Sequence, residues 1–176
     1  MLHRYFFCLR PPEMLTRQMG ALRDAQEPQE AVGNERLHMA LAITPDFAEH
    51  RPEAAEQMKI IAETVSAEPI ALCFDTIWVS GQSIALRPRR RPAALALLQN
   101  QLWRRLDYRG LAREGWSFNP HVTLGYRTGA PAEPIGIEPL EWTAREFLLI
   151  HSLVVERRHI ELGRWWLGDR QLGLPV

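Results

Sequence analysis

Two strand-like segments that each carry a histidine constrain most strongly how this chain can fold. They are residues 36–43, RLHMALAI, and residues 119–127, NPHVTLGYR. Because side chains alternate across a strand, each segment has an apolar face and an opposite face that carries the histidine with small neighbours. Each segment is therefore predicted to bury one face in a core and to leave space for a ligand over the other.

The alternation assigns every residue of the two segments to a face. In the first segment, the apolar face is predicted to hold Leu37, Met39, Leu41 and Ile43, opposite Arg36, His38, Ala40 and Ala42. In the second, Val122, Leu124 and Tyr126 are predicted to lie opposite His121, Thr123, Gly125 and Arg127. The histidine faces therefore combine imidazoles, one hydroxyl and basic side chains, which together suit an anionic ligand.

The remaining patterns indicate a mixture of strands and helices. Strands are expected at 3–9, 69–79 and 83–88, with two or three more within 140–168; helices are expected at 13–24, 52–66 and 89–106, and a Pro/Gly-rich connector at 127–136. No long linker divides the chain, so residues 1–176 are expected to form a single domain with two lobes. The predicted class is α+β, with mainly antiparallel sheets covered by helices.

Charge and composition narrow the possible functions. The 21 basic and 21 acidic residues balance, which argues against broad coating of nucleic acid but permits recognition of one phosphate or an RNA end. No run approaches the ~18 apolar residues of a membrane span, so we expect a cytoplasmic protein with no membrane partner. The basic run at residues 87–92, RPRRRP, is predicted to be a solvated loop before a helix, with contact to an RNA tail as the alternative.

Cysteines and the remaining histidines give no sign of a metal or cofactor site. Cys8 and Cys73 are too few for a disulfide framework or a four-cysteine zinc site. The other four histidines lack the H-E-x-x-H spacing and are expected to be structural or surface residues: His3, His50, His151 and His159. We therefore expect no metal and no cofactor.

Two imidazoles on opposite sides of one ligand suit in-line displacement at phosphorus. One takes a proton from the attacking oxygen, and the other protonates the leaving oxygen. Histidine fits both tasks because its ordinary pKa of ~6.5 lies near neutral pH. A hydroxyl two residues after the histidine, such as Thr123, can donate to a phosphate oxygen.

These segments resemble the motifs of the 2H phosphoesterase superfamily, and most closely its 2′-5′ RNA ligase-like branch, the RNA 2′,3′-cyclic phosphodiesterases. That family carries two H-x-[T/S]-x motifs, which HMAL at 38–41 and HVTL at 121–124 resemble. The opening RYFFCLRPPEML and the closing FLLIHSLVVERRHIELGRWWLG are also similar to family segments, in the same order. The resemblance spans nearly the whole chain.

The resemblance implies a bilobal fold in which two pseudo-symmetric sheets flank a central cleft. His38 would be the proton donor and His121 the acceptor, Thr123 would hold the phosphate, and Arg127 lies near a basic position of the family. The implied enzyme is a metal-independent hydrolase that opens a 2′,3′-cyclic phosphate to a 2′-phosphate, and reversal would be 2′-5′ ligation. Its expected substrates are RNA ends or small cyclic nucleotides, and a monomer is expected.

Ala40 departs from the family pattern, which has Thr or Ser there. A hydrogen bond to a charged group contributes roughly 1.5–3 kcal/mol, so its loss would weaken catalysis without abolishing it. Arg36 on the same predicted face could substitute. The alternatives are a non-catalytic module that binds nucleotides or RNA ends, and a 2H enzyme for another cyclic phosphodiester, such as ADP-ribose 1″,2″-cyclic phosphate.

Overall fold

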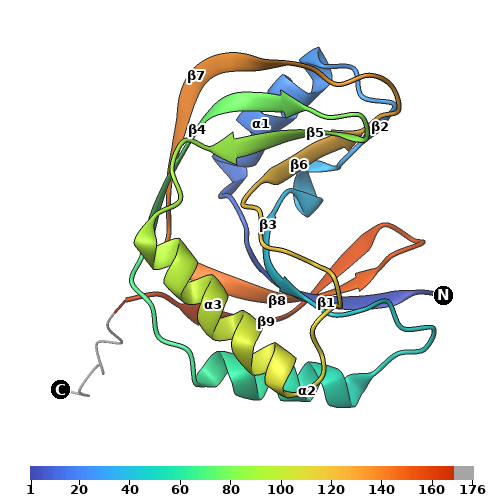
Figure 1. Cartoon of the computed structure of the whole chain (residues 1–176), viewed down its shortest axis with the longest axis vertical. Coiled ribbons are helices and arrows are strands. Elements are labelled where there is room, and N and C mark those ends of the chain that lie inside the picture. Colours follow the sequence, from blue (N-terminus) through green and yellow to red (C-terminus); the bar gives the residue numbers. More distant parts are fainter. Residues whose placement is uncertain (169–176) are drawn as a thin grey trace.

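The two histidine segments enter different β-sheets. A computed structural model describes residues 1–168, and Figure 1 shows the two sheets with their helices. The strands are β1 (His3–Leu9), β2 (Glu30–Ala31), β3 (Met39–Ile43), β4 (Ile70–Val79), β5 (Ser83–Pro88), β6 (Val122–Tyr126), β7 (Ala132–Ala144), β8 (Glu146–Leu153) and β9 (Arg158–Trp166). The helices are α1 (Glu13–Ala25), α2 (Pro52–Glu63), α3 (Ala93–Tyr108) and the 3₁₀ turn η1 (Asn34–Arg36).

Each sheet is antiparallel throughout and carries one of the histidine segments. Sheet A has the order β3-β1-β8-β9 and contains the segment of His38, whereas sheet B has the order β2-β6-β5-β4-β7 and contains that of His121. Each histidine immediately precedes its strand, β3 or β6. The predicted α+β class, with two antiparallel sheets flanked by helices, is confirmed.

The helices cover the sheets with the apolar stripes that the sequence predicts. The buried leucines of α3 recur at helical spacing and are fully enclosed: Leu95, Leu98, Leu102 and Leu106. Proline precedes or opens α2 and α3, where its missing N–H costs no hydrogen bond. Within residues 1–168, no helix combines the length and the apolar character needed to cross a membrane.

A β-bulge interrupts β3 and β6 at corresponding positions. Consecutive residues of β1 pair with Ala42 and Ala40, which leaves Leu41 without a partner. Consecutive residues of β5 pair with Gly125 and Thr123, which leaves Leu124 without a partner on β5. In each strand the extra residue is the third after the histidine, so the bulges are pseudo-symmetric.

The bulges reverse the side-chain alternation beyond them, because one extra residue moves later side chains to the other face. Ile43 was predicted on the core face with Leu41, but it packs with Phe6 on the opposite face of sheet A. Ala42 takes its place in the main core. The predicted faces therefore hold up to the bulges and are wrong after them.

The Pro/Gly-rich segment at 127–136 is only partly a connector. Its second half, from Ala132, begins the long strand β7, which pairs with β4 alone and forms an edge of sheet B. Pro134 and Pro139 fit there because proline cannot donate a ladder hydrogen bond and is tolerated on edge strands. Proline content alone therefore gave the wrong assignment for residues 132–136.

Replacing Gly125 with alanine should destabilise the bulge of β6. A Cβ atom at Gly125 would lie 2.5 Å from Cβ of Pro28 and 2.8 Å from the carbonyl oxygen of Glu30. We expect Gly125→Ala to lower the free energy of unfolding by about 1–3 kcal/mol, measured by urea denaturation. Gly136→Ala in β7 is the matched control, since a Cβ there has nothing within 4 Å; equal losses in both variants would contradict the packing argument.

Candidate active site

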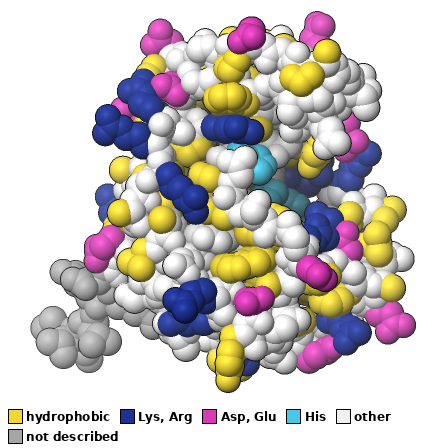
Figure 2. Space-filling model, in the orientation of Figure 1, with side chains coloured by type: hydrophobic (Ala, Val, Ile, Leu, Met, Phe, Trp, Pro, Cys, Tyr) yellow, Lys and Arg dark blue, Asp and Glu magenta, His cyan; other side chains and the backbone are white. Residues whose placement is uncertain are grey.

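A cavity of about 380 Å³ opens between the two sheets and brings the histidine segments together. Figure 2 shows histidine side chains in a hollow between the two halves of the molecule. The lining comes from both sheets and their loops: Arg4, Phe6, Glu30, Val32, Arg36, His38, Ala40, Ile43, Trp116, Ser117, Asn119, His121, Thr123, Tyr126, Ser152, Val154, Arg157 and His159. Three of the four predicted site residues, His38, His121 and Thr123, are among them.

The two imidazoles are held in the same way. Nδ1 of His38 lies 2.6 Å from the carbonyl oxygen of Arg36, and Nδ1 of His121 lies 2.6 Å from that of Asn119. Because a carbonyl oxygen only accepts, Nδ1 of each ring must carry a proton. Nε2 is then the nitrogen of each ring that can exchange a proton with a ligand.

The positions two residues after the histidines also correspond. Thr123 and Ala40 both line the cavity, each on the strand that follows its histidine. The strand of His121 therefore offers a hydroxyl to a ligand, and that of His38 offers only a methyl group.

Arg127 does not line the cavity. Its guanidinium donates to the carbonyl oxygens of Ser80, at 2.9 Å, and Ala130, at 2.6 Å, so it holds neighbouring loops. The bulge at Leu124 is the reason: it turns Arg127 off the face of His121 and brings Tyr126 to the cavity instead. The expectation that Arg127 shares the ligand-facing side is corrected.

Phe6 and His159 surround the ring of His38. The Phe6 ring stacks on that of His38 with centroids 4.7 Å apart, and the His159 ring meets it edge-on at 5.2 Å. Sequence reasoning placed His159 among structural or surface residues. It reaches the cavity because it pairs with Ser152 across β8 and β9, a contact between distant strands that leaves no local signal.

Burial favours the neutral form of His38 and of His159. Burial lowers the pKa of His38 to about 4, opposed by its hydrogen bond to Arg36, and the charges of Arg10, His121 and Arg36 lower it further. Burial and the neighbouring His38 lower the pKa of His159 to about 3. That the charge of His121 acts on His38 means that rings from both sheets share one electrostatic environment.

Cationic side chains line the cavity around these neutral rings. Of the three lining arginines, Arg157 pairs with the lining Glu30 at 3.1 Å and Arg4 pairs with Asp46, which leaves Arg36 as the least compensated charge. Arg36 lies 3.7 Å from the exposed Glu35, a long contact that leaves its charge available to a ligand. The lining therefore favours an anion.

Unpaired polar atoms also favour a polar ligand. Among residues 1–168, three buried side-chain nitrogens have no hydrogen-bond partner, namely Nε of Arg10, Nε of Arg87 and Nδ1 of His159. The first and third belong to residues whose charges or rings act on His38. Buried polar atoms without partners are rare in folded proteins, and of these three residues His159 lines the cavity, so its Nδ1 is a place where a ligand or water would be stabilised.

The basic run at 87–92 lies outside this cavity. Arg89 pairs with Asp75 at 2.6 Å, and Arg87 and Arg91 each sit 4.6 Å from the centroid of an aromatic ring, those of Trp78 and Phe118. These contacts hold Arg87, Arg89 and Arg91 against neighbouring side chains at the surface.

Comparison with known proteins identifies the family. The sequence model of the 2′-5′ RNA ligase superfamily matches residues 11–160. The chain belongs to the 2′-5′ RNA ligase superfamily, whose members are 2H phosphoesterases. A comparison with curated protein sequences gives no match.

Solved structures of other proteins have the same fold. E. coli LigT in complex with 3′-AMP is 25% identical with a TM-score of 0.78, over 96% of this chain and 100% of that one. A structure described as a phosphoesterase is 24% identical with a TM-score of 0.79, over 95% and 99%. A Thermus thermophilus protein is 18% identical with a TM-score of 0.74, over 93% and 97%. The last two likenesses concern the fold alone.

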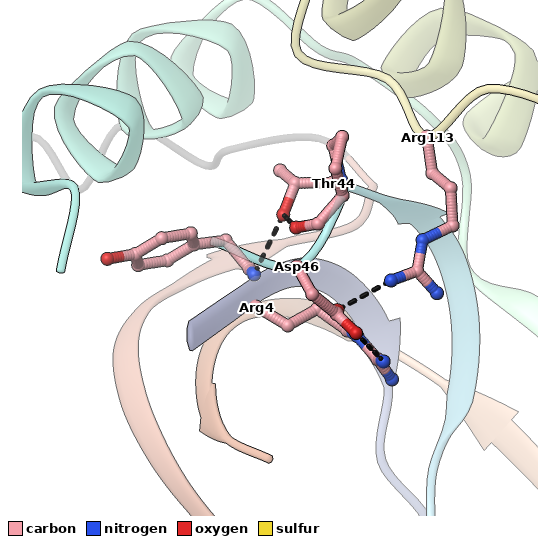
Figure 3. A network of polar contacts seen from close by, with 6 residues as sticks. Arg4, Thr44, Asp46 and Arg113 are labelled. Carbon is pink, nitrogen blue, oxygen red and sulfur yellow. Dashed lines mark hydrogen bonds and ion pairs between the residues drawn. The ribbon is translucent and has the colours of Figure 1, made fainter. Parts of the chain in front are cut away.

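The carboxylate of Asp46 holds the side chain of Arg4, which lines the cavity, together with that of Arg113. Figure 3 shows Asp46 between Arg4 and Arg113. Asp46 accepts two hydrogen bonds from Arg4, at 2.5 and 2.8 Å, and one from Arg113 at 2.5 Å. The hydrogen bond from Arg4 is the largest cause of the lowered pKa of Asp46. The cluster ties β1 to the loops that follow β3 and α3.

Asp46→Asn should therefore destabilise the protein in a pH-dependent way. At pH 7 we expect a loss of about 1–3 kcal/mol in the free energy of unfolding, because charge-assisted hydrogen bonds are replaced by neutral ones. Because the pKa of Asp46 is lowered on folding, its carboxylate stabilises the protein at pH values above the ordinary pKa of 3.8. This stabilisation is lost as the pH falls through the pKa of Asp46 in the folded protein. The difference in the free energy of unfolding between Asp46→Asn and the parent should become smaller when urea denaturation is repeated from pH 7 towards pH 3.

Glu56→Gln provides the control for this prediction. Glu56 pairs with Lys59 at 2.8 Å on the exposed surface of α2, where an ion pair contributes about 0–1 kcal/mol. A loss as large as that of Asp46→Asn, or a gap that does not change with pH, would contradict the anchoring role of Asp46.

Proposed function

We propose that this protein hydrolyses RNA or nucleotide 2′,3′-cyclic phosphates to 2′-phosphates without a metal ion, by acid–base catalysis with two histidines. The observation that carries the proposal is the matched pair His38 and His121, one from each sheet, each with Nδ1 on a backbone carbonyl and both lining one cavity. One chain supplies both rings, so we propose that a monomer is sufficient.

The reaction assigns a proton transfer to each ring. Nε2 of His121 accepts a proton from water as the water oxygen bonds to phosphorus. The bond from phosphorus to the 3′ oxygen breaks on the opposite side, and Nε2 of His38 gives that oxygen its proton. The product carries a 2′-phosphate and a 3′-hydroxyl, and the two rings have exchanged protonation states, which solvent restores. The reverse sequence, with an RNA hydroxyl in place of water, is 2′-5′ ligation.

Phosphate binding is proposed to be asymmetric. Thr123 donates a hydroxyl hydrogen bond from sheet B, whereas sheet A has Ala40 at the equivalent position. Arg36 lines the cavity two residues before His38 and supplies a positive charge in place of the missing hydroxyl. Charge that develops on the phosphoryl oxygens in the transition state is then stabilised from both sheets.

Nucleotide complexes of a relative support this substrate class. E. coli LigT, 25% identical over nearly the whole chain, has been crystallised with 3′-AMP and with NADP+. Both ligands contain adenosine and phosphate. A cavity of about 380 Å³ lies in the size range of small-ligand sites, and arginines line it.

Removing either histidine should remove activity. We expect His38→Ala and His121→Ala each to lower kcat for a 2′,3′-cyclic nucleotide by about 10²–10⁴-fold, with parent activity unaffected by EDTA. His50→Ala, an exposed histidine outside the cavity, is the control and should retain parent activity. Full turnover by either cavity variant would contradict the proposal, and nucleotide binding without turnover in the parent would favour a non-catalytic module.

A substrate with a better leaving group should separate the two roles. A 4-nitrophenyl phosphodiester releases a phenolate that needs no proton, so loss of the donor costs little with it. We expect His38→Ala to recover most of its lost rate on this substrate, and His121→Ala to recover none. If His121→Ala recovers its rate instead, His121 is the proton donor and His38 is the acceptor.

The pH dependence should be bell-shaped. His121 must be neutral to accept a proton, so activity should fall at low pH, and His38 must be protonated to donate one, so activity should fall at high pH. In the free protein the pKa of His38 is about 4, so at neutral pH its donor form is scarce until a ligand binds. A bound phosphodiester is negative and raises the pKa of neighbouring imidazoles, which populates the donor form of His38, so the whole profile of kcat should lie at higher pH than that of kcat/KM. A profile that stays flat from pH 5 to 9 would contradict a pair of acid–base histidines.

The two positions after the histidines offer a matched pair of variants. Thr123→Ala should lower kcat/KM by about 10–100-fold through loss of a charged hydrogen bond. Ala40→Thr restores a hydroxyl on sheet A and should preserve or raise kcat/KM. A large loss in Ala40→Thr would mean that the cavity is shaped for another phosphodiester, which a panel of cyclic substrates including ADP-ribose 1″,2″-cyclic phosphate would identify.

A further inference from the structure

Three histidines outside the cavity gather at one end of sheet A. One ring nitrogen from each of His3, His50 and His151 lies within 4.8 Å of the others. His3 and His151 are buried, at 8% and 6% exposure, whereas His50 is exposed. Their positions in the sequence are far apart, so no local motif announces the cluster.

Backbone pairing fixes where these rings lie. β1 and β8 are paired antiparallel, with His3 opposite Leu153 and Tyr5 opposite His151. The loop that carries His50 is tied to β1 by two hydrogen bonds of 2.8 Å between the backbones of His3 and Phe47. The cluster is therefore organised by the fold before any ligand binds.

The cluster lies on the opposite face of sheet A from the cavity. Arg4 and Ser152, which pair with each other, line the cavity. His3 and His151 are their neighbours along β1 and β8, and side chains alternate between the two faces. A ligand on this cluster would be separated from the cavity by the thickness of the sheet.

Two rings of the cluster are in direct contact through their nitrogens. Nδ1 of His3 and Nε2 of His151 lie 2.9 Å apart, so one ring donates an N–H and the other accepts it with a lone pair. Burial, followed by the charges of His50 and His3, lowers the pKa of His151. Neutral imidazole with an unshared lone pair is the form that binds transition metals.

We propose that His3, His50 and His151 form a binding site for a divalent transition metal of the Zn²⁺ class, with water as the fourth ligand. Zn²⁺ takes three imidazole nitrogens at about 2.0–2.1 Å, which places them roughly 3.3 Å apart in a tetrahedral site. Small changes in side-chain torsion angles would move the nitrogens of His3 and His151 apart from 2.9 Å and bring the more widely separated ring nitrogens, which lie within 4.8 Å, closer together. The ring that donates in the shared hydrogen bond moves its proton to its other nitrogen, so both buried rings bind the metal as neutral imidazoles and no proton is released.

Tyr5 supplies the partner that orients His50. Its hydroxyl oxygen lies 2.8 Å from Nδ1 of His50 and accepts a hydrogen bond of 3.0 Å from the backbone N–H of Arg51. With Nδ1 of His50 engaged by this hydroxyl, Nε2 is the nitrogen left for the metal. Metal-binding histidines usually donate their second ring N–H to such a partner, so Tyr5 is a positioning residue.

Zinc titration of the full chain, without a histidine tag and freed of metal by chelation, tests the site. Competition with a chromophoric chelator should give one Zn²⁺ per parent chain. His50→Ala removes an exposed ligand and should weaken Zn²⁺ binding by well over tenfold, and Tyr5→Phe by about 10–100-fold. Saturating Zn²⁺ should raise the Tm of the parent and leave that of His50→Ala unchanged.

His121→Ala is the matched control, because the cavity also contains imidazoles that could take up zinc. We expect this variant to bind Zn²⁺ as the parent does, and bound Co²⁺ should give the visible spectrum of a tetrahedral site in both. The proposal is overturned if the parent binds no Zn²⁺, if His50→Ala binds it equally well, or if His121→Ala alone loses binding. Zinc affinity is measured separately from hydrolysis, so these outcomes do not depend on the proposed reaction.

Discussion

Two backbone carbonyl groups decide which nitrogen of each cavity imidazole faces a ligand. The carbonyls of Arg36 and Asn119 each take the Nδ1 proton of the histidine two residues later, at 2.6 Å. The tautomer is therefore set by the local chain and not by the ligand. Because each histidine lies immediately before a strand, any shift of β3 or β6 would move the carbonyl and the ring together. The orientation of each imidazole is therefore set within its own sheet and does not depend on the other sheet.

Burial and positive charge act together on the half of the cavity formed by sheet A. The stacked ring of Phe6 and the edge of His159 cover part of His38, and nearby arginines add charge, so neutral imidazole is the stable form of this residue in the free protein. An anion that enters the cavity is opposed by little negative charge. Binding of the anion affects His38 more than it would an exposed histidine, because partly buried charges are screened less by solvent.

The sequence predicts the fold well wherever its signals are local. Alternation placed His38, His121 and Thr123 on ligand-facing sides, and the cavity lining includes all three. Helical spacing located α1, α2 and α3 to within a few residues. The resemblance to known motifs led to the family that the comparison with known proteins identifies.

Features that depend on pairing between distant strands were not predictable. The bulges at Leu41 and Leu124 arise from the register with β1 and β5, and they moved Tyr126 to the cavity and Arg127 away from it. His159 and the cluster of His3, His50 and His151 are assembled by β1, β8 and β9, whose order in the sheet does not follow the sequence. The prolines of β7 predicted a loop, because proline is tolerated in a strand mainly at the edge of a sheet. The edge position of β7 is known only once the sheet is assembled.

The prolines of β7 also bear on how separate molecules meet. An edge strand presents backbone groups that can pair with a strand from another molecule, a common route to aggregation. β7 is 13 residues long and would otherwise offer a long template, but Pro134 and Pro139 lack the N–H groups that an incoming strand needs. The residues that obscured this strand in the sequence thus protect the free border of sheet B against unwanted self-association.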